Sequence, residues 1–163
     1  MVESDRPAVE RRHPPDALMK VVNPVMRRLV ARGRAAEQLV VLHYTGRRTG
    51  RRYDVPAGYH VVDGVPTVFT NSGWRHNFAG APQIEVSYRG RLRPTRAELV
   101  TDVDTVTDVY VRLIEQLGWQ RAQRRLGLRI TVGRTPTREE VAAAVTQSGL
   151  SLVRLPGLVD AGA

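Results

Sequence analysis

The sequence contains no cysteine. Disulfides, thiolate nucleophiles and cysteine-ligated metal sites are therefore excluded. The sequence also lacks an apolar run long enough to cross a bilayer, and its first residues carry charges where a signal peptide needs an apolar stretch. These absences predict a soluble, cytoplasmic protein.

Lysine is almost absent, because Lys20 is the only one and the net charge of +9 comes from arginine. Nucleic-acid-binding domains usually mix lysine with arginine, and neither helix-turn-helix nor zinc-finger spacing is visible. We therefore interpret the basicity as a local attraction for phosphate or carboxylate groups and expect no nucleic-acid partner. The four histidines lack metal-ligand spacing, so no metal is expected either.

The length of 163 residues favours a single domain over 16–156, between a disordered tail (1–15) and a loose tail (157–163). Apolar residues at helical spacing predict a kinked helix, or two short ones, within 16–32. The opposite face of this helix is basic. We expect the helix to cover one end of the domain, with weak docking on an anionic membrane as the alternative.

Segments rich in β-branched and aromatic residues predict six strands. The predicted strands span 39–45, 53–62, 67–71, 84–89, 92–100 and 150–155. Asp63-Gly64, between two of these segments, is a strong hairpin signal. Successive antiparallel strands favour a closed or half-closed barrel, because closure removes exposed sheet edges.

Helices are predicted mainly after the first five strands. They span 102–117, 120–126 and 135–149. The last of them carries a capping-box pair, Thr137 and Glu140, and ends at Gly149. The intervening segment 72–82 is too polar for a strand, and we expect about one helical turn in its middle.

The turn "TGRRTGRR" carries four arginines: Arg47, Arg48, Arg51 and Arg52. Their mutual repulsion is unfavourable, and a bound anion would relieve it. Glycines at Gly46 and Gly50 allow backbone N–H groups to converge, and Thr49 adds a hydroxyl, which together suit a phosphate. The alternative is a solvated basic turn without a ligand.

A second candidate site follows the third predicted strand. It consists of Thr70, Asn71, Ser72, Gly73, Trp74, Arg75, His76 and Asn77. Small hydrogen-bonding groups beside a large aromatic side chain suit the edge and face of a flat heterocycle. Alternatively, Trp74 and Phe78 are core anchors of a short helix.

Taken together, "TGRRTGRRYDVPAGYHVVDGVPTVFTNSGWRHNFAGAPQIEV" resembles the deazaflavin (coenzyme F420)-dependent nitroreductase family over roughly 39–100. The family's "TGR(K/R)(S/T)G" turn is matched by residues 45–50. Its downstream proline falls on Pro56, and its "W-x-x-N" falls on Trp74 and Asn77. Three features depart from the family pattern: Tyr53 replaces an arginine, Gly73 replaces a lysine, and the loop before Trp74 is shorter.

The resemblance implies an α+β split β-barrel, mostly antiparallel with about six strands, an N-terminal helix and C-terminal helices. It implies F420 as the cofactor, with FMN, haem or a fatty acid as alternative occupants. Arg47, Arg48 and Thr49 would hold the cofactor phosphate beside Gly50, and Arg52 would substitute for the arginine missing at Tyr53. Residues 70–72 and 74–77 would border the ring.

The implied function is hydride transfer from reduced F420 to a nitro, quinone or enone acceptor. The sequence does not identify a catalytic residue: Tyr44, Tyr59, His60 or solvent could supply the proton, and His43 is interpreted as structural. A non-catalytic cofactor- or lipid-binding barrel is the alternative, and a nucleic-acid-binding barrel ranks third. By analogy, the helix after Val100 would support a homodimer.

Overall fold

The computed structural model describes residues 7–11 and 39–159. The chain divides into two compact units. The barrel unit consists of 14–99 and 152–163, and the helical unit consists of 1–13 and 100–151. The helix predicted over 16–32 lies outside the described residues, and the single domain over 16–156 stays a prediction.

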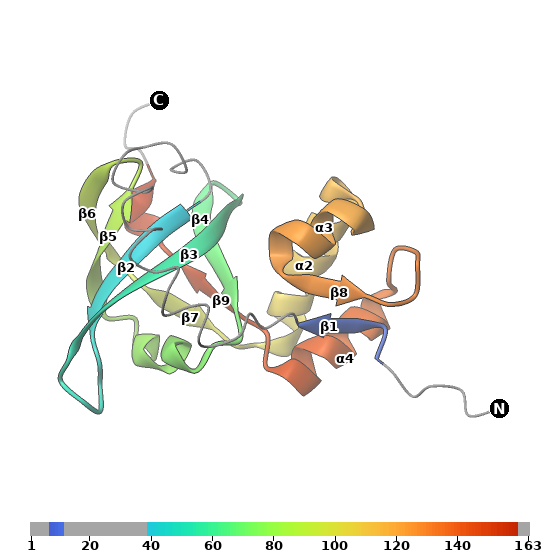
Figure 1. Cartoon of the computed structure of the whole chain (residues 1–163), viewed down its shortest axis with the longest axis horizontal. Coiled ribbons are helices and arrows are strands. Elements are labelled where there is room, and N and C mark those ends of the chain that lie inside the picture. Colours follow the sequence, from blue (N-terminus) through green and yellow to red (C-terminus); the bar gives the residue numbers. More distant parts are fainter. Residues whose placement is uncertain (1–6, 12–38, 160–163) are drawn as a thin grey trace. The chain divides into compact units, whose positions relative to one another are not determined.

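The barrel unit is built on one curled, antiparallel sheet of seven strands (Figure 1). The strands are β2 (Leu39–Thr45), β3 (Arg52–Val62), β4 (Val65–Thr70), β5 (Gln83–Tyr88), β6 (Arg91–Arg96), β7 (Glu98–Val100) and β9 (Ser151–Arg154). Their order across the sheet is β6-β5-β2-β3-β4-β9-β7. The expected α+β half-barrel is confirmed, with one strand more than expected. The strand predicted over 92–100 is interrupted at Ala97, whose side chain is buried and whose N–H donates to Pro82 O at 3.0 Å.

Alternation along the central strands separates the barrel core from the outer face of the sheet. On β2, Val40, Leu42 and Tyr44 point into the core, while His43 lies on the other face. The register pairs Leu42 with Val86 of β5, which is also a core residue. Every second residue of β2 therefore contributes to the core, although Val41 on the other face is also buried.

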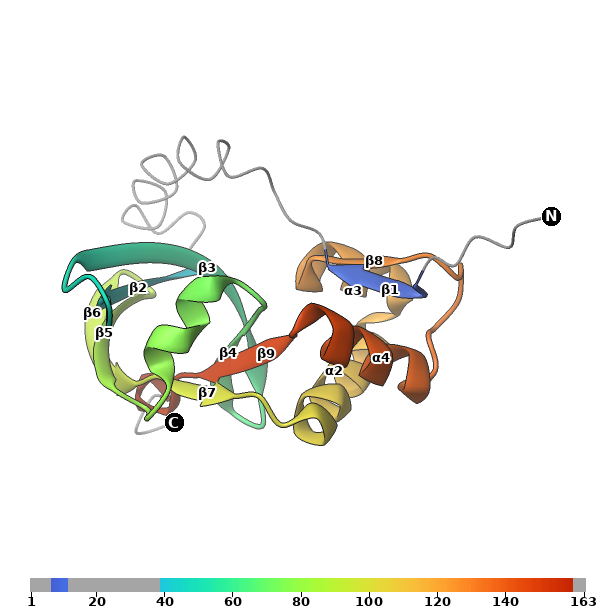
Figure 2. The same cartoon turned by 90° about the horizontal axis from the view of Figure 1, so that it is seen from below.

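The 3-10 helix η1 (Gly73–Phe78) lies across one end of the curled sheet (Figures 1 and 2). This agrees with the single helical turn expected within 72–82. Phe78 is fully buried and joins the barrel core, and Trp74 packs against the same core. The short helix therefore closes the barrel with its aromatic side chains.

The predicted loose tail over 157–163 is wrong for its first residues. A second 3-10 helix, η2 (Pro156–Leu158), buries Leu158 in the barrel core. Gly157 N donates to Thr95 Oγ1 at 2.8 Å, and a Cβ at this glycine would lie 2.8 Å from Pro94 O. The segment stays in place because an apolar anchor and a close backbone approach hold it against β6.

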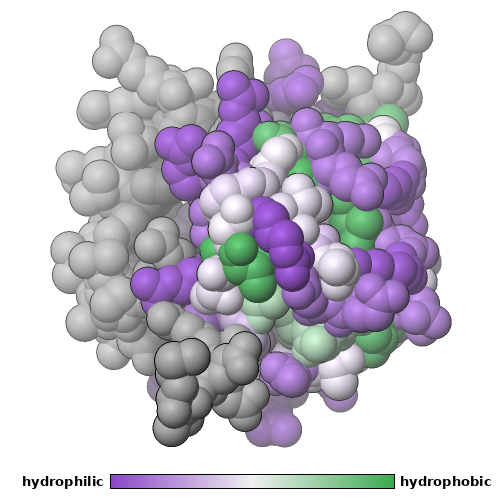
Figure 3. All heavy atoms as spheres, turned by 90° about the vertical axis from the view of Figure 1, so that its right-hand side faces the viewer, coloured by the Kyte–Doolittle hydropathy of each residue, from purple (hydrophilic) through white to green (hydrophobic). Residues whose placement is uncertain are grey.

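The helical unit contains β1 (Val9–Arg11), α2 (Val103–Leu117), α3 (Trp119–Leu126), β8 (Leu128–Ile130) and α4 (Arg138–Ser148). On the face seen in Figure 3, hydrophilic side chains surround smaller hydrophobic patches. The three predicted helices are present, and α4 begins with the predicted capping box and ends at Gly149 in the left-handed conformation. Across the described part of the chain, no helix is both long and apolar enough to cross a membrane.

The prediction of a disordered tail over 1–15 is wrong for 9–11, which form strand β1. This strand pairs with β8, which was not predicted, so that Val9 lies opposite Ile130 and is buried. The Arg11 guanidinium donates to Leu126 O at the end of α3. The strand forms through contacts with residues more than a hundred positions away, which local composition does not reveal.

Candidate functional site

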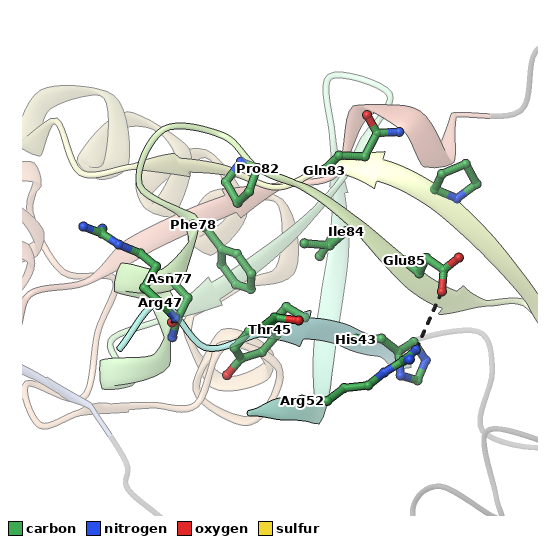
Figure 4. Close-up of a pocket in the computed structure, with 12 residues that line it drawn as sticks. His43, Thr45, Arg47, Arg52, Asn77, Phe78, Pro82, Gln83, Ile84 and Glu85 are labelled. Atoms are coloured by element: carbon green, nitrogen blue, oxygen red, sulfur yellow. Dashed lines mark hydrogen bonds and ion pairs between the residues drawn. The ribbon is translucent and has the colours of Figure 1, made fainter. Parts of the chain in front are cut away.

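A cavity opens in the barrel unit where β2 and β5 separate. The ladder between these strands ends at the pair His43 and Glu85, although β2 continues to Thr45 and β5 begins at Gln83. The space between the diverging ends has a volume of about 570 Å³ (Figure 4). Its lining residues are His43, Tyr44, Thr45, Arg47, Arg52, Asn77, Phe78, Pro82, Gln83, Ile84, Glu85 and Pro94.

The inner wall of the cavity is apolar and aromatic. The rings of Tyr44 and Phe78 meet edge to face at 5.1 Å, and Tyr53 stacks on Tyr44 at 5.6 Å. Ile84 contributes an aliphatic surface from β5. Burial of Tyr44, and secondarily its proximity to Tyr53, raises the pKa of its phenol, so this side chain stays neutral at physiological pH. Such a wall suits a flat, largely apolar ring.

Arg47 joins the arginine turn to the end of η1. Its backbone N–H donates to Asn77 Oδ1 at 2.9 Å, and its guanidinium donates to His76 O at 3.2 Å. The amide of Asn77 is held in turn by a bond from Nδ2 to Trp74 O at 2.9 Å. The two candidate sites found in the sequence therefore meet at one edge of the cavity, although thirty residues separate Arg47 from Asn77.

Internal hydrogen bonds use most of the backbone donors of the turn. Gly46 N donates to Arg51 O at 2.8 Å, and Gly50 N donates to Gly46 O at 3.0 Å. Arg51 N donates to Thr49 Oγ1 at 3.2 Å. Among the described turn residues, only the N–H groups of Arg48 and Thr49 remain for a ligand. The turn therefore offers fewer free N–H groups to an anion than its glycines suggest, because most of them form hydrogen bonds within the turn.

The structure places three of the predicted site residues on the cavity wall, namely Arg47, Arg52 and Asn77. The others lie in the exposed turn or along the segment before and within η1. These are Arg48, Thr49, Gly50, Thr70, Asn71, Ser72, Trp74, Arg75 and His76. Arg75 Nη1 donates to the carbonyls of Asn71 and Ser72 at 2.8 and 2.9 Å, which fixes this loop. The roles of these residues in binding stay predictions.

His43 and Glu85 line the cavity and were not selected from the sequence. His43 Nδ1 lies 2.7 Å from Asp54 Oδ1, and its Nε2 lies 2.7 Å from Ser87 Oγ. Arg52 lies 3.8 Å from Glu85 as an exposed ion pair. The alternating pattern of β2 placed His43 on the outer face, but only the strand register identifies its partners.

Residues 18–133 match the F420H(2)-dependent quinone reductase family. The chain belongs to this family. Coenzyme F420 is accordingly its supported cofactor, rather than FMN or haem. The family assignment supports an F420-dependent oxidoreductase with a half-barrel fold and leaves the nitroreductase activity expected from the sequence to experiment.

Among solved structures, the chain is similar to the crystal structure of the conserved hypothetical protein Rv2991 from Mycobacterium tuberculosis. The two are 16% identical, with 91% of this chain and 83% of that chain covered and a TM-score of 0.44. No curated protein matches the sequence.

The cavity has the properties that F420 requires. Its volume of about 570 Å³ falls in the range of roughly 300–1,000 Å³ typical of small-molecule sites. The aromatic inner wall lies between two lining arginines (Figure 4). The Arg52 guanidinium lies beside Glu85, and the Arg47 guanidinium points along η1, where it donates to His76 O. A ring and an acidic tail would each find suitable side chains in this arrangement. The residues present therefore fit the cofactor of the family.

Proposed function

We propose that this protein transfers a hydride from reduced F420 to a small, flat organic acceptor of the quinone, nitro or enone type. The observation that carries the proposal is the cavity at the end of the β2–β5 ladder, because it joins an aromatic wall to the arginine turn. The family assignment supports quinones first among these acceptors.

Arg47, Arg48 and Thr49 would hold the phosphate of the cofactor. Arg47 is oriented for this by its bonds to Asn77 and His76, and Arg48 and Thr49 still offer their backbone N–H groups. Guanidinium groups form strong charge-assisted bonds with phosphate oxygens. The turn would therefore set the position of the cofactor along the cavity.

Tyr44, supported from behind by the fully buried Phe78, would pack against the ring and exclude water from one of its faces. Their edge-to-face contact keeps both rings in place. The bound cofactor supplies a hydride at its reduced ring, which is the difficult chemical step. The contribution of the protein is to orient two flat molecules against each other and to limit access of solvent.

Titration of the purified protein with F420, FMN and haem tests the cofactor assignment. We expect micromolar binding of F420, weakened at least about tenfold in Arg47→Ala/Arg48→Ala, since each lost charge-assisted bond is worth about 1.5–3 kcal/mol. Arg47→Ala and Arg51→Ala form a matched pair of single variants, because each removes one positive charge from the same turn but only Arg47 lines the cavity. If Arg51→Ala weakens F420 binding as much as Arg47→Ala does, the loss of affinity reflects the overall positive charge of the turn and not a specific contact.

Turnover separates the enzyme from a non-catalytic carrier. Reduced F420 mixed with protein and a soluble quinone should recover the absorbance of the oxidised cofactor, and a carrier would bind without this change. A nucleic-acid-binding barrel makes a different prediction, since its affinity for polynucleotide would fall steeply as salt rises. Tight F420 binding that persists at high salt would exclude that alternative.

A further inference from the structure

Three polar side chains from three neighbouring strands form a continuous hydrogen-bonded chain beside the cavity. Asp54 Oδ1 lies 2.7 Å from His43 Nδ1, and Ser87 Oγ lies 2.7 Å from His43 Nε2. The exposed fractions of the His43 and Asp54 side chains are 18% and 30%, so the group is shielded but not sealed. His43 itself lines the cavity.

The strand register explains why these residues meet. His43 lies directly opposite Asp54 on β3 and opposite Glu85 on β5, while Ser87 is two residues further along β5. All of them lie on the outer face of the sheet, where residues of adjacent strands are in contact. His43 is therefore held between two carboxylates, of which only Asp54 forms the short contact.

The remaining groups around His43 contribute one further charge. Arg52, on β3, lies next to Glu85 at 3.8 Å and partly neutralises it. Strand β6 places Leu92 opposite Ser87 and Pro94 opposite Glu85, and neither side chain is charged. Among these charged groups, only Asp54 is in hydrogen-bonding contact with the imidazole.

The partners of the ring allow His43 to gain or lose a proton without losing either bond. Asp54 accepts from Nδ1–H in both states. When the ring is neutral, Ser87 donates its hydroxyl proton to Nε2; when the ring is charged, Ser87 accepts from Nε2–H. A histidine held in this way stores a proton while its position stays fixed.

We propose that His43 stores the proton that the reduced acceptor takes up, with Asp54 and Ser87 as the residues that position it. The proposal rests on the proposed function. Reduction of a quinone to its hydroquinone adds one hydride and one proton. The hydride brings both electrons from the reduced cofactor, which is oxidised, and the proton comes from His43.

The proton leaves Nε2 through Ser87. The Nε2–H bond breaks as Ser87 Oγ accepts this proton, and the hydroxyl proton of Ser87 passes to water. Ser87 does not itself line the cavity, so water carries the proton from Ser87 to the quinone oxygen. His43 is then neutral and recovers a proton from solvent. Oxidation of the cofactor releases one proton, and this proton passes to solvent. Atoms, charge and electrons balance over the cycle.

The other candidate donors are less suited to this role. Burial raises the pKa of Tyr44, which makes its phenol a weaker acid. Tyr59 is buried against Tyr88 in the core, and neither it nor His60 lines the cavity. Within the described residues, His43 is the histidine on the cavity wall.

The first test compares His43→Gln with His60→Asn. Glutamine can still hydrogen-bond to Asp54 and Ser87 but cannot carry a proton, whereas His60→Asn removes a histidine of the same sheet that lies away from the cavity. We expect quinone reduction to fall about 100-fold in His43→Gln, as for loss of a positioned acid, in a variant that still binds F420. The wild-type rate should fall as pH rises and the stored proton is lost, and this dependence should vanish in His43→Gln.

Ser87→Ala and Asp54→Asn provide a second route if His43→Gln does not fold. Both variants leave the imidazole in place but remove one of the two groups that position it. Both should therefore lower the rate of quinone reduction and the solvent deuterium isotope effect on that rate. A readout independent of turnover is ¹⁵N NMR of the ring in the protein without cofactor. The neutral ring should carry its proton on Nδ1, because this nitrogen faces the Asp54 carboxylate.

Wild-type rate and pH dependence in His43→Gln would overturn the inference, as would a neutral ring protonated on Nε2. Covalent labelling of Ser87 by a fluorophosphonate would also overturn it, because the same three groups would then form a nucleophilic centre. Absence of F420 binding or of turnover in the wild type would instead refute the proposed function, and the inference with it.

Discussion

Arginines at the start of α4 in the helical unit and arginines of the turn in the barrel unit differ in their ion pairing. In the helical unit, Arg134 donates to both oxygens of Glu140, at 3.0 and 2.8 Å, and Arg138 pairs with Asp108. In the barrel unit, no described carboxylate pairs with Arg47 or with its neighbours in the turn, Arg48 and Arg51. The difference indicates that the arginines at the start of α4 are neutralised by neighbouring carboxylates, whereas those of the turn can attract an anion from outside.

The largest expected loss of stability comes from a substitution in the aromatic wall of the barrel unit. Phe78→Ala should destabilise this unit by about 3–5 kcal/mol, because the side chain is fully buried between Tyr44 and Trp74. Hydrogen exchange followed by mass spectrometry should show faster exchange in β2 and β5 and unchanged protection in α2 and α4. Equal loss of protection in both units would contradict their separate cores.

Thr137→Ala applies the corresponding change to the helical unit. It removes the acceptor for Glu140 N at the start of α4 and should cost about 1 kcal/mol of stability. Denaturant unfolding measures the loss, and Thr137→Ser should retain most of the stability. F420 binding should be unchanged in both variants, and a weakened affinity would show that this unit affects the site.

Asn77→Ala should have a small effect on stability and a larger one on binding. It removes the acceptor of the Arg47 N–H, an exposed bond worth about 0.5–1 kcal/mol. The turn then keeps only the bond from the Arg47 guanidinium to His76 O as its attachment to η1, so F420 should bind several-fold more weakly in calorimetry. Asn77→Asp retains an acceptor oxygen but adds a negative charge beside the phosphate site, and it should weaken binding further.

The smallest expected effect is a loss of stability of α4 at acidic pH. Hydrogen bonds from Arg134, and secondarily from the Thr137 N–H, lower the pKa of Glu140 from 4.5 to about 2. A lowered pKa stabilises the folded state above the unfolded value, so this contribution should disappear as pH falls from about 4.5 towards 2. Helix content measured by circular dichroism should decrease over this interval, and less so in Glu140→Gln. The pair is exposed, so salt should reduce the difference.

Local signals predicted the helical unit and the strands well. The capping box of Thr137 and Glu140 formed as expected, and β2 has the predicted bounds. The sequence missed β1, β8 and the break at Ala97, because these depend on distant partners: Arg11 on Leu126, and Ala97 on Pro82. For the site, it identified Arg47, Arg52 and Asn77, but not His43 or Glu85.

The sequence by itself determined the alternation of strands, the helix ends and the concentration of arginines on one turn, because each depends on neighbours within a few residues. Only the tertiary structure decided that Arg47 contacts Asn77 and that β2 and β5 separate after His43. It also decided that Asp54 and Ser87 hydrogen-bond to the two nitrogens of the His43 ring. These contacts depend on strand register, which is fixed by packing across the whole sheet.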